Sequence, residues 1–114
     1  AAGYDIVPFE QDHGFSTTLG YRIGPFAYST DVIDLDDRAF AALAGTEIWI
    51  VDCIRRAPHV THSHLAKTLS WIERVRPRRA ILTHMDQSLD YDTLRRSLPP
   101  GVEPGYDGLV INFP

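Results

Sequence analysis

The sequence predicts an α/β layered domain. Two short apolar runs, Glu47–Cys53 (EIWIVDC) and Ala80–Thr83 (AILT), are typical of strands that are buried on both faces of a sheet. Between them, four apolar residues recur at spacings of 4, 3 and 3, which is the pattern of an amphipathic helix: Leu65, Leu69, Ile72 and Val75. A strand, a helix and a second strand in this order predict a sheet that is covered by helices.

Further strands are expected in the first third of the chain and at its end. Apolar and β-branched residues cluster there between turn residues, and Gly24 separates two of the runs as a hairpin turn would. The expected strands are Tyr4–Phe9, Ser16–Ile23, Pro25–Ser29 and, closing the chain, Gly108–Phe113.

Three helices are expected beside these strands. Asp36–Leu43 has acidic residues in its first turn and a glycine just past its end, which favours a short helix. The amphipathic stretch spans Ser63–Arg74, and a proline three residues later ends it. Tyr91–Leu98 forms a third helix, which a Pro-Pro pair stops.

Composition narrows the class of protein. The 114 residues are 44% hydrophobic and 23% charged, which is typical of one globular domain, so we expect residues 1–114 to form a single domain. The formal net charge of −4 disfavours a broad nucleic-acid surface, and no apolar run approaches the roughly 20 residues of a membrane span. Cys53 is the only cysteine, so no intrachain disulfide is expected, which fits a cytoplasmic location.

Polar residues with metal-binding chemistry stand at predicted strand ends. His84 follows the strand AILT directly, Asp31 ends the strand-like stretch FAYSTD, and His13 precedes a glycine. Two histidines and an aspartate from separate segments form a reasonable partial ligand set for Zn²⁺ or Mn²⁺. From the residues alone, a surface or capping role for each histidine and a turn role for Asp31 remain alternatives.

Four short strings, in this order, resemble a known family. DHG at 12–14, YSTD at 28–31, HVTH at 59–62 and LTHMD at 82–86 look like the C-terminal half of a metallo-β-lactamase-fold hydrolase. The resemblance is nearest to the cyclic-phosphate phosphodiesterases of phosphonate breakdown, and the ending LPPGVEPGYDGLVI shares it. It implies half of an αββα sandwich, in which one mixed β-sheet carries helices on its outer face.

The resemblance implies a role for each matching residue. His13 matches a histidine ligand of one metal ion, Asp31 the carboxylate that bridges two ions, and His84 a ligand of the second ion. His62 matches a histidine that is not a ligand and assists proton transfer beside the phosphate. Two divalent ions, zinc or manganese, would then activate a water molecule and offset the charge on the phosphoryl oxygens.

Three more residues have open roles. Asp52 ends the strongest predicted strand, where it would either orient a neighbouring ligand or cap the turn. His59 and His64 flank His62 in the polar loop Arg55–His64, and each would either support the site or be solvated.

One departure from the family pattern limits the expected activity. The signature His-x-His-x-Asp-His, which supplies most of the metal ligands in the N-terminal half of the family fold, does not occur in this sequence. We therefore expect the isolated chain to be inactive and to hold one ion or none. The chain begins without a methionine, so we expect either a trimmed initiator or a start partway through a longer protein.

The predicted function is metal-dependent hydrolysis of a small cyclic or diester phosphate, in a protein that has both halves of the fold. One alternative is a related hydrolase that acts on another ester or on RNA 3′ ends. Another is a non-catalytic α/β module that pairs with a partner through an uncovered face. The expected partners are a small phosphate ester and either the missing N-terminal half or a second copy in a homo-oligomer, with neither membrane nor nucleic acid involved.

Overall fold

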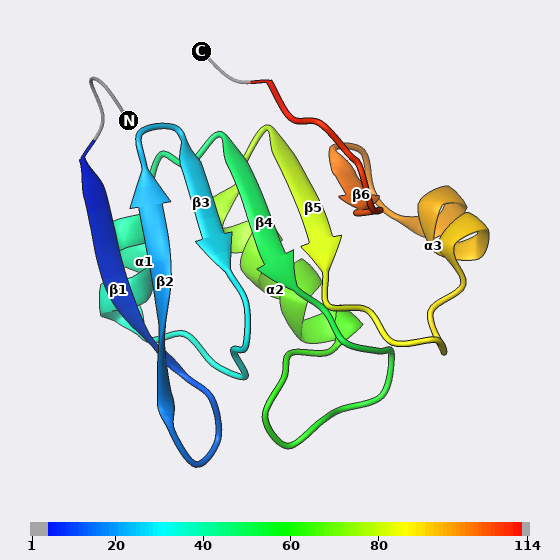
Figure 1. The fold of residues 1–114 in the computed structure, drawn as a ribbon, viewed down its shortest axis with the longest axis horizontal. Helices are drawn as coiled ribbons and strands as arrows, with labels where there is room; N and C mark the ends of the chain where they lie inside the picture. Colours follow the sequence, from blue (N-terminus) through cyan, green and yellow to red (C-terminus); the bar gives the residue numbers. More distant parts are fainter. Residues whose placement is uncertain (1–4, 113–114) are drawn as a thin grey trace.

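A six-stranded mixed sheet organises the computed structural model, which describes residues 5–112 (Figure 1). The strands lie side by side in chain order: β1 (Ile6–Asp12), β2 (Thr17–Ile23), β3 (Phe26–Ser29), β4 (Ile48–Asp52), β5 (Arg79–Thr83) and β6 (Val102–Pro104). The pairs β1–β2 and β2–β3 are antiparallel, whereas β3–β4, β4–β5 and β5–β6 are parallel. The predicted mixed sheet is therefore confirmed.

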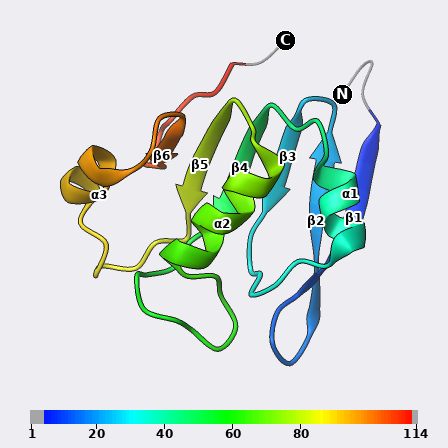
Figure 2. The ribbon, with the colours of Figure 1, turned by 180° about the vertical axis from the view of Figure 1, so that it is seen from behind.

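Two of the three helices cover one face of this sheet. Figure 2 shows α1 (Asp37–Leu43) and α2 (Leu65–Val75) packed on the same side, while α3 (Tyr91–Ser97) lies beside β6 at the edge. The helices follow β3, β4 and β5, because each parallel pair of strands needs a crossover connection. Helices on one side of a mixed sheet form the half-sandwich that the sequence predicts.

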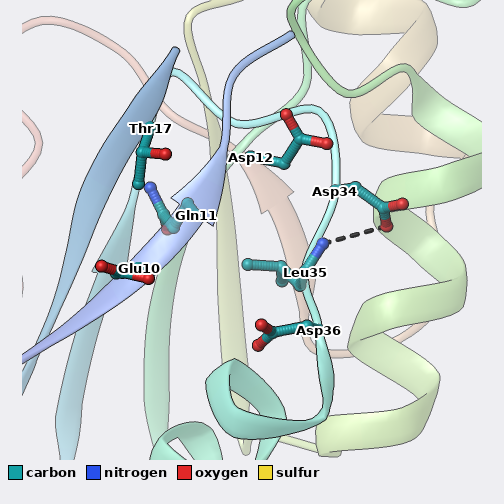
Figure 3. Close-up of a pocket in the computed structure, with 7 residues that line it drawn as sticks. All are labelled: Glu10, Gln11, Asp12, Thr17, Asp34, Leu35 and Asp36. Atoms are coloured by element: carbon teal, nitrogen blue, oxygen red, sulfur yellow. Dashed lines mark hydrogen bonds between the residues drawn. The ribbon is translucent and has the colours of Figure 1, made fainter.

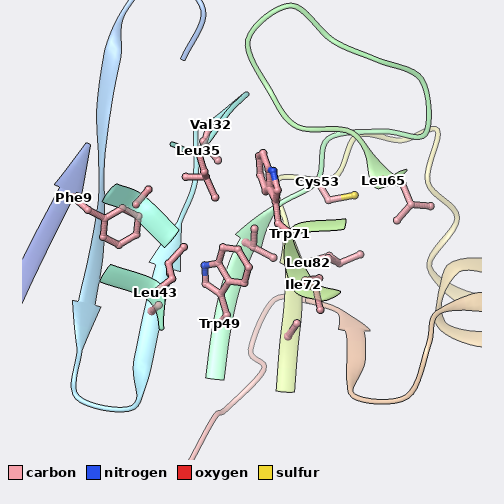
Figure 4. Packing of buried hydrophobic residues seen from close by; sticks show 14 of the residues in the cluster. Phe9, Val32, Leu35, Leu43, Trp49, Cys53, Leu65, Trp71, Ile72 and Leu82 are labelled. Atoms are coloured by element: carbon pink, nitrogen blue, oxygen red, sulfur yellow. The ribbon is translucent and has the colours of Figure 1, made fainter. Parts of the chain in front are cut away.

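The core lies between the sheet and the helices α1 and α2 (Figure 4). Trp49 and Val51 of β4 are fully buried there, and Leu43 of α1 and Ile72 of α2 belong to the same cluster. Burial of each such side chain contributes about 1.5–3 kcal/mol. The indole Nε1 of Trp49 donates a hydrogen bond to Ser29 Oγ at 3.0 Å, so the polar atom of this large residue is satisfied inside the core.

Local signals explain where the helices begin and end. Asp36 Oδ1 accepts a hydrogen bond from the amide of Ala39, and Asp90 Oδ2 accepts one from the amide of Thr93, so aspartates cap α1 and α3. Arg76 ends α2 in the left-handed conformation with φ of 56°. Among the described residues, no helix is long and apolar enough to cross a membrane.

The opposite face of the sheet has no helix over it, as the two views show (Figures 1 and 2). Alternation along the strands places Leu19, Tyr21 and Tyr28 on this side, where they are 48%, 37% and 41% exposed. We call this the open face of the sheet. It is more apolar than a solvated sheet face needs to be.

The C-terminal strand is the one predicted element that the structure places at a different position in the sequence. The expected strand at Gly108–Phe113 is not part of the sheet over its described residues, and Phe113 lies outside them. The sixth strand is Val102–Pro104 instead, because these residues pair with β5. The sequence shows little sign of this strand, since three residues ending in proline look like part of a turn.

Two other elements differ from the prediction by more than one residue at a boundary. The first strand extends to Asp12, because its polar end pairs with the start of β2; Tyr4, its expected first residue, lies outside the described residues. Helix α2 begins at Leu65 rather than Ser63, and His64 occupies its N-cap.

Candidate metal centre

The sheet brings four chain segments to one edge. Strands β3, β4 and β5 are mutually parallel, and β1 runs in the same direction because two antiparallel pairings separate it from β3. The segments after these four strands therefore meet at one edge of the sheet (Figure 1). They carry His13, Asp31, His62 and His84, which are the four residues that the sequence assigns to metal binding and proton transfer.

Unusual backbone conformations turn two of these side chains toward the others. Asp31 has φ of 53° and His84 has φ of 63°, in the left-handed region that residues other than glycine seldom adopt. Each follows the end of a parallel strand. Such strain, of order 1–3 kcal/mol per residue, persists where the surrounding structure fixes the conformation, and it concentrates at functional sites.

His62 lies at the centre of the cluster. Its ring centroid is 4.9 Å from that of His13, 4.4 Å from that of His84 and 5.3 Å from that of His59. Its Nε2 atom lies 3.9 Å from Asp31 Oδ1. The structure therefore brings all four candidate residues together, from positions that span 71 residues of sequence (84 − 13).

Asp52 holds His62 from behind. Its carboxylate is fully buried, and Oδ2 accepts hydrogen bonds from His62 Nδ1 at 2.9 Å and from the Val32 amide at 3.2 Å. The ring proton on Nδ1 then points to Asp52 and leaves Nε2 facing Asp31. Burial raises the pKa of Asp52, an effect that the hydrogen bond from His62 opposes. The sequence left two roles open for Asp52, orienting a neighbouring ligand or capping the turn. In the structure its carboxylate contacts both His62, which the resemblance treats as a non-ligand, and the backbone amide of Val32.

The second carboxylate oxygen of Asp52 has no hydrogen-bond partner. Oδ1 is buried and lies 3.8 Å from His84 Nδ1. A buried carboxylate oxygen without a partner is costly, so its place beside the histidine cluster is consistent with a positively charged occupant.

His13 is oriented in the way that metal-binding histidines usually are. Its Nδ1 lies 2.8 Å from the carbonyl oxygen of Thr61 and donates to it, which leaves Nε2 free to bind a ligand. Close packing of the neighbouring turn makes this contact possible. Gly14 has φ of 75°, and a Cβ there would lie 2.8 Å from Thr61 Cγ2, so only glycine fits.

The donor set fits a divalent metal ion. His13, Asp31 and His62 offer ligand atoms within 4.8 Å of one another, and so do Asp52, His62 and His84. All are nitrogen or carboxylate oxygen donors, which suit zinc and manganese alike. The side chains of Asp31 and His84 are about half exposed, so one side of the cluster is open to solvent.

The two remaining candidate histidines, His59 and His64, differ in their contacts with this centre. The Nδ1 atom of His59 accepts a hydrogen bond from the Thr61 amide at 3.1 Å, and its pKa is lowered by desolvation and by the nearby Arg55. Its ring packs edge-on against His62. His64 instead occupies the N-cap position of α2, where its side chain makes no capping hydrogen bond, and it belongs to neither metal-capable group.

Sequence reasoning missed the residues that brace the centre. Thr18 Oγ1 donates to the carbonyl oxygen of Asp31 at 2.8 Å, which supports the strained turn there. Thr68 Oγ1 donates to the carbonyl oxygen of Asp52 at 2.6 Å and ties β4 to α2. A threonine in a strand or a helix has no pattern that would distinguish this role, so no signal in the sequence could have found them.

An acidic hollow beside β1 is a separate feature (Figure 3). Three of its four carboxylates serve local turns or caps: Asp12 Oδ1 accepts from the Gly14 amide, Asp34 Oδ1 from the Leu35 amide, and Asp36 caps α1. None of these three residues belongs to the metal-capable groups of the described chain. The hollow therefore has a structural explanation.

Known structures with the same fold agree with this architecture. A diphosphatase described as new in the PhnP family is 32% identical and superposes with a TM-score of 0.96, covering all of this chain and 45% of its own. The metallo-beta-lactamase fold protein YhfI from Bacillus subtilis is 16% identical, with a TM-score of 0.78, and 49% of it is covered. Human tRNase Z, short form, is 14% identical, with a TM-score of 0.74, and 45% of it is covered. At these lower identities, YhfI and tRNase Z support the fold alone.

Sequence comparisons gave one curated relative and one matching family. An octanoyltransferase from Porphyromonas gingivalis is 26% identical over 110 residues, which are 95% of this chain but only 22% of that protein. The chain thus spans about a fifth of this relative and about half of the structures above. The family described as the beta-lactamase superfamily domain matches residues 1–85. The chain therefore belongs to the beta-lactamase superfamily and forms about half of a metallo-β-lactamase fold.

Proposed function

We propose that this chain supplies one half of the active site of a metal-dependent phosphodiesterase that acts on a small cyclic or diester phosphate. The observation that carries the proposal is the pair Asp52–His62, which faces Asp31 at a cluster able to bind metal. The likeness to the diphosphatase of the PhnP family, at 32% identity, supports phosphate chemistry in particular.

His13, Asp31 and His84 are the residues that would hold the metal ions. Bound zinc or manganese would supply Lewis acidity at the phosphoryl oxygens and lower the pKa of a coordinated water molecule. The half-exposed position of Asp31 and His84 leaves room for a substrate phosphate beside them.

His62 would act as the general acid. With Nδ1 bonded to Asp52, a protonated His62 carries its second proton on Nε2, on the side of the cluster. Hydrolysis breaks a phosphorus–oxygen bond, and the leaving alkoxide takes up this proton while water supplies the new oxygen on phosphorus. Asp52 stabilises the protonated ring before the transfer and keeps Nε2 directed at the leaving oxygen.

The site proposed here is incomplete in this chain alone. Three ligands shared between two ions leave several positions that other protein groups or water must fill. We propose that the complementary half of the fold supplies these groups and that the isolated chain is inactive.

The cytoplasm remains our prediction for its location, because Cys53 is the only cysteine.

The test uses a chimera in which residues 1–114 are joined to the part of the PhnP-family diphosphatase that this chain does not match. Turnover is measured on a ribose cyclic phosphate, on bis(p-nitrophenyl) phosphate and on a transfer-RNA precursor, together with metal content. We expect Asp31→Ala to lose both bound metal and turnover. We expect His62→Ala to keep its metal and to lose about 10²–10⁴-fold in kcat.

Asp37→Ala serves as the matched control, because it removes a carboxylate that is 97% exposed on α1 and should change nothing. Full turnover by His62→Ala would contradict the general-acid role. Retention of metal by Asp31→Ala would contradict the ligand assignment, and preferential cleavage of the RNA would contradict the substrate class.

A further inference from the structure

Both peptide groups that flank Asp31 are held by side chains. The carbonyl oxygen of Thr30, in the first group, accepts a hydrogen bond from Gln11 Nε2 at 3.1 Å. The carbonyl oxygen of Asp31, in the second, accepts one from Thr18 Oγ1 at 2.8 Å, and the amide of this second group donates to Asp52 Oδ2. The backbone on each side of the strained residue is therefore fixed from β1, β2 and β4.

Gln11 and Thr18 form one hydrogen-bond network. They are cross-strand partners in β1 and β2, and Gln11 Nε2 donates to Thr18 Oγ1 at 3.3 Å. The hydroxyl of Thr18 thus accepts from the amide of Gln11 while it donates to Asp31. One amide group on the edge strand fixes the first peptide group directly and orients the hydroxyl that fixes the second.

The fold alone gives Gln11 an unfavourable position. Its side chain is 2% exposed, and among the described residues its Oε1 atom has no hydrogen-bond partner (Figure 3). A buried oxygen of this kind is costly, and an apolar side chain of the same size would avoid the cost. Phe9, two residues earlier in β1, is an apolar core residue. Residues that break a local rule in this way are expected at functional sites.

We propose that Gln11 is a positioning residue of the metal centre. Together with Thr18, it holds Asp31 in the left-handed conformation, at φ of 53°. In this conformation Asp31 Oδ1 lies 3.9 Å from a ring nitrogen of His62 and 3.5 Å from one of His84. The inference rests on the proposed function, because it takes Asp31 as a metal ligand. It extends the site to a residue outside the short motifs and accounts for the costly buried amide.

The first test measures metal affinity in the chimera described above, by competition of zinc with a chelator and without any assay of activity. Gln11→Met retains the length of the side chain and removes the amide, and Thr18→Val removes the hydroxyl. We expect each to weaken zinc binding about 10–100-fold, the usual effect of removing a group that supports a metal ligand. Thr18→Ser retains the hydroxyl and should restore the affinity. The double variant should lose much less than the product of the two single losses, because both residues act through Asp31.

Two controls separate positioning from stability. Thr17→Val changes the neighbouring threonine of β2, which is exposed and points to the other side of the strand, so zinc affinity should not change. The second control is the Tm of the metal-free chain. Gln11→Met loses the bonds from Nε2 but also removes the unpartnered oxygen, so we expect a shift of less than about 4 °C. A merely structural role would lower the Tm further and leave the zinc affinity of the folded chimera unchanged.

The backbone chemical shifts of Asp31 in the metal-free chain test the positioning without any metal. We expect them to move away from left-handed values in Gln11→Met and Thr18→Val and to stay constant in Thr17→Val. Two results would overturn the proposal: Asp31 shifts that equal those of the wild type in both variants, or unaltered zinc affinity of Gln11→Met in a chimera whose Asp31→Ala variant loses its metal. If Asp31→Ala keeps its metal, the proposed ligand assignment fails instead, and the chemical shifts decide the role of Gln11.

Discussion

Two substitutions of Asp52 distinguish the contribution of its hydrogen bonds to stability from the contribution of its charge. Asp52→Ala removes the oxygen that accepts a hydrogen bond from the Val32 amide. Both Val32 and Asp52 are fully buried. A buried donor left unpaired costs about 1–3 kcal/mol. Asp52→Asn retains an oxygen in that place and removes a charge whose second oxygen has no partner. We therefore expect Asp52→Asn to be more stable than Asp52→Ala by about that amount.

Thermal unfolding of the metal-free chain at neutral pH measures this difference. For a domain of this size, 1 kcal/mol corresponds to about 4 °C in Tm, so the two variants should differ by about 4–12 °C. Asp37→Ala, at a carboxylate that is 97% exposed and forms a surface ion pair with Arg74, provides the baseline. Equal Tm values for Asp52→Asn and Asp52→Ala would refute the reasoning, because they would show that the bond from Val32 contributes nothing to stability.

Three further predictions concern the frame around the site. Leu43→Ala should cost about 2–5 kcal/mol in urea unfolding, because Leu43, the last residue of α1, is fully buried and its truncation leaves a cavity; a cost below 1 kcal/mol would contradict the core assignment. Gly20→Ala should lower the Tm, since its Cβ would clash with the ring of Phe9; an unchanged Tm would mean that the Phe9 ring can move aside. The hydrogen bond from the Thr93 amide lowers the pKa of Asp90 in the folded chain below its ordinary value of 3.8. The stability that this cap gives to α3 is therefore fully present above pH 3.8, and it is lost as the pH falls through the lowered pKa of the folded state. The Thr93 amide shift should therefore titrate below pH 3.8 in the wild type and stay flat in Asp90→Asn.

The parts of the fold that sequence reasoning predicted are those with strong local patterns. Strand β4 and helix α2 have apolar residues at spacings that only one type of element explains. The structure confirms both elements, and each of their boundaries lies within two residues of the predicted one. The same holds for α1, whose capping aspartate stands directly before it. Here local preference and tertiary packing favour the same conformation.

The C-terminal region shows where local patterns fail. Val102–Pro104 forms a strand because it pairs with the edge of β5. The sequence of these three residues does not indicate that pairing. The opposite holds for residues 108–112, whose β preference is strong but which pair with no strand of the described chain. Strand formation depends on a partner, so a sequence pattern can predict the tendency and still misplace the strand.

The candidate site shows a similar division. Short motifs identified His13, Asp31, His62 and His84, and parallel strand order explains why they converge. The sequence left two roles open for Asp52, because its contacts depend on how the loop after β4 folds back to place His62 over the end of its own strand. That geometry comes from contacts between residues far apart in the sequence.

The wide spacing of the site in the sequence also bears on the order of folding. The four clustered residues are separated by 18, 31 and 22 positions (31 − 13, 62 − 31 and 84 − 62), so they meet only after β1, β3, β4 and β5 have assembled. Contacts between residues far apart in the sequence slow the assembly of a chain. A cation that binds here would therefore contact a completed sheet. It would retard unfolding and leave the rate of folding unchanged, in the manner of interactions that are absent from the transition state.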